Sequence, residues 1–179
     1  MKSFLVLIPV LLFFIVSCSA PRDSDFEPLA NDFAIQAEDK SLALRESVSA
    51  TDLEGVLGKP MTETVEHLRG DGFTGSRLKK VKYDGLEMEL FSPEDDGDTF
   101  WIMTMVVSTA KYPTPRGVRI GSSAKQMAKA YPGIQVANDG RSVPMNGAYE
   151  AEDDHESNRI LFEVENGIVT QIKIFHLIP

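Results

Sequence analysis

The chain has 179 residues with 18 basic and 27 acidic side chains, a formal net charge of −9. This acidic balance argues against binding of nucleic acid or another polyanion through bulk charge. A single cysteine excludes an intrachain disulfide. The length is enough for one domain with a full core, or for two small units that share one.

The first 17 residues have the layout of an export signal, because Lys2 precedes an apolar run over residues 4–16 and Ser17 precedes Cys18. The run is too short to span a bilayer, so it predicts a cleaved signal peptide and not an anchor helix. Its ending resembles the bacterial lipoprotein signal. That resemblance implies cleavage before Cys18 and lipidation of the Cys18 sulfur. The alternative is an ordinary signal peptide cut near Ala20, which would leave no cysteine in the mature chain.

The residues that follow the cysteine indicate where the protein is located and how its folded part is joined to the membrane. Ser19 stands where an aspartate favours inner-membrane retention in many Gram-negative bacteria. We therefore expect a protein of the bacterial cell envelope, attached to the membrane through N-terminal acyl chains, in the outer membrane and facing the periplasm. Residues 18–32 are polar and acidic and include Pro21 and Pro28, which predicts a flexible tether, with folding from Phe33.

The folded part is expected to use one unit twice, over residues 33–110 and 111–179. In each unit a hydroxyl residue that can cap a helix precedes apolar residues four apart and then a glycine. These residues are Ser49 or Thr51, Leu53, Leu57 and Gly58 in the first unit, and Ser122 or Ser123, Met127, Tyr131 and Gly133 in the second. Each pattern predicts a short helix, followed by a β-hairpin.

The first hairpin is predicted around a two-residue turn at Asp84 and Gly85. That turn fixes a register in which one face is apolar and the other pairs opposite charges. The predicted cross-strand pairs are Tyr83 with Leu86, Lys82 with Glu87, Val81 with Met88, and Lys80 with Glu89.

Residues 100–107 predict a strand that is apolar on both faces and therefore central in its sheet. Strict alternation puts Phe100, Ile102 and Val106 on one face, and Trp101, Met103, Met105 and Val107 on the other. One of the two faces then needs a cover or forms a binding surface.

The C-terminal hairpin turns at Glu165, Asn166 and Gly167. A strict two-residue turn would place Glu165 opposite Ile168. A three-residue loop with Gly167 left-handed is preferred, because it sets Val164, Phe162 and Ile160 on one face with Ile168, Thr170 and Ile172. One further strand is predicted near residues 148–150, and residues 61–68 fit either a helix or a strand.

The expected fold class is α+β, with two tandem helix-plus-hairpin units that lay short helices on one face of an antiparallel sheet. The segments 52–60 (DLEGVLGKP), 114–121 (TPRGVRIG) and 130–133 (AYPG) carry a resemblance. They resemble small bacterial lipoproteins built from the helix-then-sheet repeat of the β-lactamase inhibitory protein, a unit also found in the small lipoprotein of the outer-membrane barrel-assembly machinery. The barrel-assembly member has one such unit where this chain has two. The resemblance implies a protein that holds other proteins or envelope components, with no catalysis.

The candidate partner-binding residues are in the 100–107 strand. Methionine and aromatic residues are favoured at protein-binding surfaces, and methionine adapts to irregular partners. The candidates are Phe100, Trp101, Met103, Met105 and Val107. The competing interpretation is that these side chains form the core beneath the helices.

Catalytic, metal and cofactor sites are not predicted. Ser122 and Lys125 have the Ser-x-x-Lys spacing of penicillin-recognising enzymes, but the companion motifs are absent and a capping role is favoured. His155, in the acidic run 152–156, is the basis of an alternative hypothesis, in which the protein is a hydrolase or binds a small ligand or a cation. An inhibitor of a secreted enzyme is a third hypothesis. The leading one is a non-enzymatic module that binds an envelope or secreted protein.

Overall fold

The structure is a computed structural model that describes residues 30–70, 72–93, 97–137, 139, 146–153 and 157–177. These residues form two α-helices, one short 3-10 helix and eleven strands. No helix in this part of the chain is long and apolar enough to cross a bilayer. Cys18, the tether up to residue 29 and His155 lie outside the described residues.

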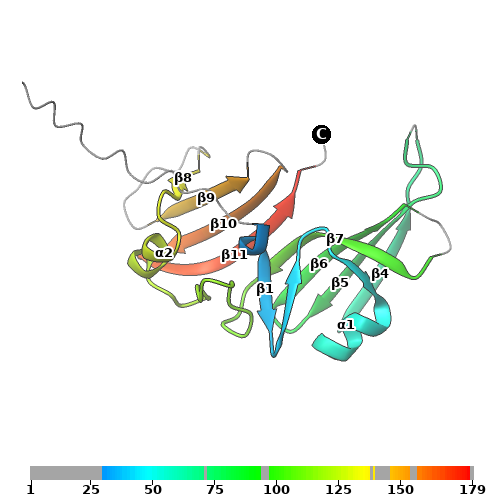
Figure 1. The fold of residues 1–179 in the computed structure, drawn as a ribbon, viewed down its shortest axis with the longest axis horizontal. Helices are drawn as coiled ribbons and strands as arrows, with labels where there is room; N and C mark the ends of the chain where they lie inside the picture. The colour runs from blue at the N-terminus through cyan, green and yellow to red at the C-terminus, as the bar shows by residue number, and fades with distance from the viewer. Residues whose placement is uncertain are drawn as a thin grey trace, which may run out of the picture.

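The elements follow one another along the chain as Figure 1 shows. The helices are η1 (Ala30–Asp32), α1 (Ala50–Leu57) and α2 (Ala124–Ala130). The strands before α2 are β1 (Ala34–Ala37), β2 (Lys40–Ala43), β3 (Ser47–Ser49), β4 (Thr62–His67), β5 (Arg77–Tyr83), β6 (Leu86–Ser92) and β7 (Thr99–Val107). The strands after α2 are β8 (Gln135–Val136), β9 (Gly147–Asp153), β10 (Asn158–Glu165) and β11 (Ile168–His176).

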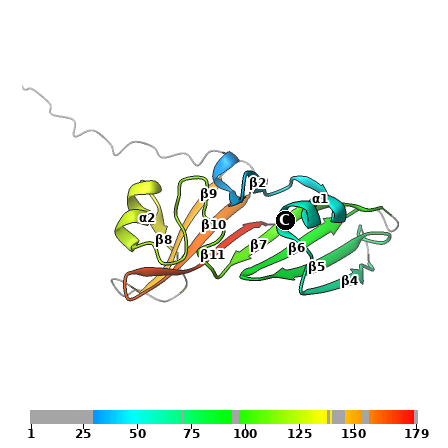
Figure 2. The same ribbon diagram turned by 90° about the horizontal axis from the view of Figure 1, so that it is seen from below.

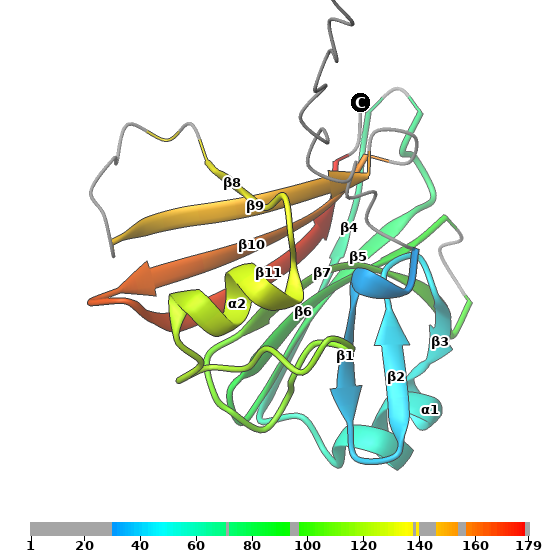
Figure 3. The same ribbon diagram turned by 60° about the vertical axis from the view of Figure 1, so that its left-hand side comes forward.

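Nine of the strands form one antiparallel sheet. Eight of them follow the order β4-β5-β6-β7-β11-β10-β9-β8, and β3 pairs with part of β7. Strands β1 and β2 make a separate hairpin. Figure 2 shows this hairpin and both helices on the same side of the large sheet, where the hydrophobic core lies. In Figure 3 the strands on the two sides of the β7–β11 junction run in clearly different directions.

The expected α+β fold is wrong, because the described chain is mostly β. Its two helices have only eight and seven residues, and the sheet has nine strands. Residues 34–49 form three strands that no turn signal indicated. The ambiguous segment 61–68 contains the strand β4, and the strand near 148–150 extends over seven residues as β9.

The predicted helix starts are confirmed and have a local cause. Ser49 and Ser123 each cap a helix with a capping box. At α1 the backbone N–H of Asp52 donates to Ser49 Oγ, and the N–H of Ser49 donates to the Asp52 carboxylate. Ser49 Oγ also donates to the Asp52 carboxylate at 2.6 Å, and this hydrogen bond, followed by the one from the Ser49 N–H, lowers the pKa of Asp52. The apolar residues Leu53, Met127 and Tyr131 are buried as predicted.

The hairpin of β5 and β6 has the predicted register in all four pairs, from Tyr83 with Leu86 to Lys80 with Glu89. Val81, Tyr83, Leu86 and Met88 are buried on the core side. The charged pairs lie on the opposite face, where Lys80 Nζ is 3.3 Å from Glu89 Oε1. Turn chemistry and alternation together were sufficient to fix this register.

The preferred register of the C-terminal hairpin is wrong. Asn166 and Gly167 form a two-residue turn with φ of 51° and 75°, and Glu165 faces Ile168. A bulge between Glu163 and Val164 then shifts the ladder, with Thr170 as the extra residue on β11. Consequently Phe162 faces Ile172 and Ile160 faces Ile174, while Val169 replaces Thr170 on the core side.

Strand β7 is central, as predicted, because β6 pairs with one side of it and β11 and β3 with the other. The predicted alternation of its faces is wrong. A bulge adds Met103 to β7 opposite the step from Glu89 to Leu90. The bulge reverses the side-chain phase, so Phe100, Ile102, Met105 and Val107 all lie in the core.

Candidate functional site: the open face of the sheet

The candidate site lies on the face of the sheet opposite the helices. Lys80 and Lys82 of β5 and Glu87 and Glu89 of β6 project there, alternating with core residues on the same strands. Two adjoining grooves hollow this face and share Glu89 and Thr104 in their walls. We call them the polar groove, of about 320 Å³, and the aromatic groove, of about 380 Å³.

The polar groove is walled by ion pairs. Lys80 and Lys82 of β5 bind Glu89 and Glu87 of β6, and Lys173 of β11 lies on its far side. The pairs are half exposed, so each contributes at most about 1 kcal/mol to stability. Neutralised charges of this kind leave a hydrophilic surface without a strong preference for an anion or a cation.

The aromatic groove is lined mainly by apolar side chains. Phe73 stands edge-on to Phe91 with ring centroids 6.5 Å apart, and Phe91 lies 6.2 Å from Trp101. We call these three residues the aromatic cluster; Phe73 and Phe91 line the aromatic groove, and Trp101 adjoins it through Phe91. Phe73 is 41% exposed and Trp101 is 43% exposed. The walls of the groove are Leu68, Phe73, Leu78, Phe91 and Met103, with Arg69, Glu89, Thr104 and His176 as polar members.

Local structure explains why these side chains meet. Phe91 and Trp101 are cross-strand partners on β6 and β7 and therefore share a face. Phe73 comes from the turn between β4 and β5, where its N–H donates to the carbonyl of Gly70. Met103 reaches the groove because it is the bulged residue. The site therefore joins strands with a loop that is close to the sheet edge.

Of the five residues predicted to bind a partner, the structure brings only Trp101 and Met103 to the open face. Phe100, Met105 and Val107 are buried in the core. Above the Phe100 ring lie the Arg77 guanidinium at 5.2 Å and the Lys79 ammonium at 5.0 Å. The prediction also missed Phe73 and Phe91. Phe91 was accessible to sequence reasoning, since extending the confirmed β5–β6 register by two residues places it on the charged face.

Among the residues that the structure describes, those considered for catalysis are not assembled into a site. Ser122 is not the helix cap; its Oγ accepts from the N–H of Arg119, and Ser123 caps α2. In the described part of the acidic run, the Glu152 carboxylate is 2.8 Å from Arg159 Nη2. His176 Nδ1 is 3.0 Å from Oδ1 of the buried Asn158. Within the described ranges, no three His, Cys, Asp or Glu side chains are placed to hold a metal ion.

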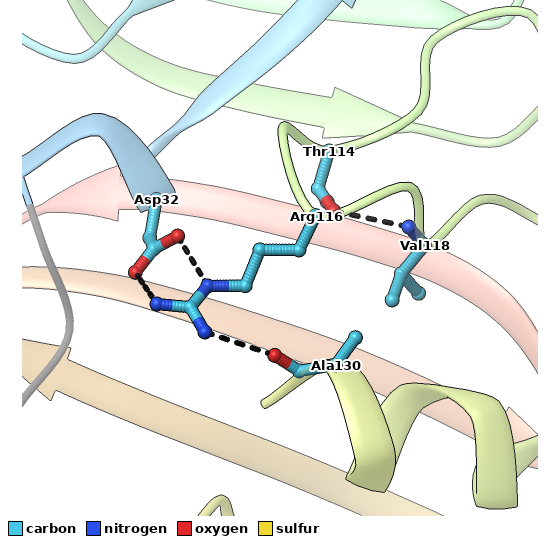
Figure 4. A network of polar contacts seen from close by, with 5 residues as sticks. All are labelled: Asp32, Thr114, Arg116, Val118 and Ala130. Carbon is cyan, nitrogen blue, oxygen red and sulfur yellow. Dashed lines mark hydrogen bonds and ion pairs between the residues drawn. The ribbon is translucent and has the colours of Figure 1, made fainter. Parts of the chain in front are cut away.

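A second polar network lies on the helix side of the sheet (Figure 4). Asp32 is 4% exposed and forms a bidentate ion pair with Arg116, with Nε–Oδ1 and Nη2–Oδ2 distances of 2.5 and 2.7 Å. Arg116 Nη1 also donates to the carbonyl of Ala130 at the end of α2. The hydrogen bond to Asp32 raises the pKa of Arg116, and burial raises the pKa of Tyr131 beneath it to about 12.

This network holds parts of the fold together and is not a reaction centre. Arg116 remains a cation and Tyr131 remains protonated at neutral pH, so neither is prepared to exchange a proton. The ion pair instead ties the first described turn, η1, to the loop before α2 and to the end of that helix. Asp32 therefore belongs to the folded part, although the sequence placed it at the end of the tether.

Substitution Asp32→Ala is expected to lower the free energy of unfolding by about 2 kcal/mol, because it leaves the partly buried Arg116 without its bidentate partner. Denaturant unfolding measures the change. Asp39→Ala, at an exposed position in the β1–β2 turn, is the control and should change stability by less than about 0.5 kcal/mol. Equal stabilities for the two variants would contradict the assigned role of the ion pair.

Comparison of the chain with models of protein families, with curated proteins and with solved structures finds no match.

Proposed function

We propose that this chain is a non-enzymatic lipoprotein of the bacterial cell envelope that binds a protein partner through the aromatic groove. The observation that carries the proposal is the aromatic cluster, because Phe73 and Trp101 are both more than 40% exposed and both contact the ring of Phe91 between them. Tryptophan and other aromatic residues dominate the binding energy of protein interfaces. The aromatic groove also contains Met103, whose flexible side chain suits an irregular partner surface.

The surroundings of the cluster match the anatomy of an interface. Five apolar side chains line the aromatic groove together with polar residues that include Arg69 and Glu89, and Glu89 is paired with Lys80. A polar rim around an apolar centre is the usual arrangement in non-obligate complexes. We therefore expect a partner that presents an apolar or aromatic side chain to the groove.

The membrane part of the proposal depends on the N-terminal sequence. Lipidation of Cys18 would attach the chain by acyl groups, and residues 19–29 would join the lipid to the first described turn. Fully extended, a segment of this length reaches roughly 35–40 Å, enough to let the open face meet a partner beside the membrane. We propose the outer membrane, facing the periplasm, as its location.

A pull-down from native envelopes tests the binding site. Full-length chain, crosslinked in its own membrane, should retain a specific protein, and Trp101→Ala should lose that protein while its melting temperature stays within a few degrees. The matched control is Ile168→Ala, since Ile168 is also a large exposed apolar residue, 40% exposed, but lies at the β10–β11 turn. Capture that is unchanged in Trp101→Ala, or lost equally in both variants, would refute the aromatic groove as the site.

A further inference from the structure

The two ends of the large sheet differ. At one end β8 has two residues, and natural sheets commonly limit edge pairing by such short strands. At the other end β4 has six residues, all exposed, in an unbroken register with β5. Among the described residues no strand pairs with the outer side of β4. Residues 62–67 contain no proline, lysine or bulge, and of the other common protections of an edge they carry only the charged side chains of Glu63 and Glu66.

The turn at residues 84–85 determines which backbone groups β4 presents at this edge. In a two-residue hairpin the residues that flank the turn form a hydrogen-bonded pair, so Tyr83 and the other odd residues of β5 bond to β6. The even residues of β5 therefore bond to the even residues of β4. The N–H of Leu68 donates to the carbonyl of Ser76, in agreement with this pattern, whereas the N–H of Met61, just before β4, donates to the carbonyl of Lys82 and lies outside it. Glu63 and Val65 consequently direct their N–H and C=O groups away from the sheet.

We propose that β4 pairs antiparallel with β4 of a second copy of this chain, with the two-fold axis at Val65. The pairing would form a continuous sheet across two molecules by adding one strand edge to another, as in β-augmentation. A closed two-fold contact uses the same surface on both copies, so β4 must be complementary to itself.

The side chains of β4 select this register. The core face of one copy continues into the core face of the other only if odd-numbered residues pair with odd-numbered residues and even with even. A register shifted by one residue would exchange the two faces. An axis at Glu63 or at Glu66 would place two identical carboxylates directly opposite each other. An axis at Thr64 avoids this conflict but pairs Glu63 with the apolar Val65.

The axis at Val65 gives the best set of pairs. Val65 faces itself, and Glu63 faces His67 of the second copy on both sides of the axis, where carboxylate and imidazole can hydrogen-bond. Glu63 is already held 2.9 Å from the ammonium of Lys79, which fixes its position and balances its charge. Thr64 faces Glu66 on the open side. No like charges are opposed in this register.

One strand pair is a small interface, so the dimer is expected to be weak in dilute solution. Attachment of both copies to one membrane would raise their effective concentration and favour pairing. The contact does not involve the aromatic cluster, although Leu68, in a wall of the aromatic groove, would lie opposite Thr62 of the second copy.

A disulfide at the axis tests the register. In a hydrogen-bonded antiparallel pair the two Cα atoms are about 5.5 Å apart, within the range that a disulfide spans. Full-length Val65→Cys in detergent micelles should form a covalent dimer on mild oxidation. Val136→Cys, on the short edge strand β8 and 54% exposed, is the matched control, and the parent chain reports any dimer formed through Cys18. Equal or slower dimerisation of Val65→Cys relative to Val136→Cys would overturn the proposal.

A second variant tests the contact without new covalent chemistry. Val65→Lys places two ammonium groups opposite each other at the axis and should weaken dimerisation roughly tenfold or more. Sedimentation equilibrium of the full chain from micromolar to millimolar concentration measures this change, with Val136→Lys as the control. Because Val65 is 42% exposed, both variants should keep the parent melting temperature. A parent chain that stays monomeric throughout, or a dimer that Val65→Lys leaves intact, would overturn the proposal.

Discussion

Replacing Met105 by alanine is expected to lower the free energy of unfolding by about 3 kcal/mol, because the substitution leaves a cavity in a fully packed core. The Met105 side chain is 0% exposed and lies among Met88, Ile174 and other members of the hydrophobic core. The bulge at Met103 turns Met105 inward. Urea unfolding at neutral pH, analysed by linear extrapolation, measures the change.

Met103 provides the control on the same strand. It lines the aromatic groove and is only half-buried, so Met103→Ala should cost about 1 kcal/mol or less. Strict alternation would place both methionines on one face and predict similar costs. A Met103→Ala variant as unstable as Met105→Ala would therefore contradict the observed phase of β7.

Gly85→Ala is expected to be destabilising to a similar extent, about 3 kcal/mol, for two reasons that add. Gly85 has φ of 74°, where an L-residue costs about 1 kcal/mol, and overpacking costs a further 1–3 kcal/mol. A Cβ at this position would lie 2.1 Å from Thr109 Cγ2 and 2.7 Å from Thr109 Cβ. Rotation about χ1 cannot relieve the second contact. The N–H of Ser108 donates to the carbonyl of Gly85 and holds the two segments together.

Two further variants separate the backbone cost from the collision. Gly117 has a similar φ of 79°, with open space around its missing Cβ, so Gly117→Ala should cost only about 1 kcal/mol. Combining Gly85→Ala with Thr109→Gly removes the colliding atoms and should show a favourable coupling energy in a double-mutant cycle. Strict additivity of the two substitutions would show that the collision does not determine the cost.

Features set by neighbouring residues were predictable from the sequence. The turn at Asp84 and Gly85 fixed four cross-strand pairs, and the Ser49 and Ser123 caps fixed both helix starts. Each depends on the chemistry of a few adjacent residues. The strands β1 and β2 were not predicted, because their short alternating segments become strands only by packing on the core of the large sheet.

The two bulges account for the main errors in side-chain direction. Met103 and Thr170 each add one residue to a strand, and no glycine or proline marks either position. The bulges result from tertiary packing. Each bulge adjusts the pairing on one side of its strand so that the side chains beyond it point into the core that the other strands form. A one-residue shift reverses every later side chain, which moved Met105 and Val107 from the predicted surface to the core.

The candidate site was predictable only in part. Trp101 precedes the bulge and kept its predicted side, whereas Phe73 reaches the aromatic cluster from a loop distant in sequence. Sequence alternation cannot place a loop residue on a sheet face. The site became visible as a cluster once the cross-strand neighbours and the β4–β5 turn were placed together.

Photocrosslinking in living cells tests the central claim most directly. A photoreactive phenylalanine derivative at position 101 of the full-length chain replaces the only tryptophan with another aromatic side chain. If the aromatic groove binds a protein partner, irradiation should yield one dominant adduct from position 101. The same derivative at the equally exposed position 168 should not yield that adduct. No protein adduct from position 101, or the same adduct from both positions, would contradict the proposed function.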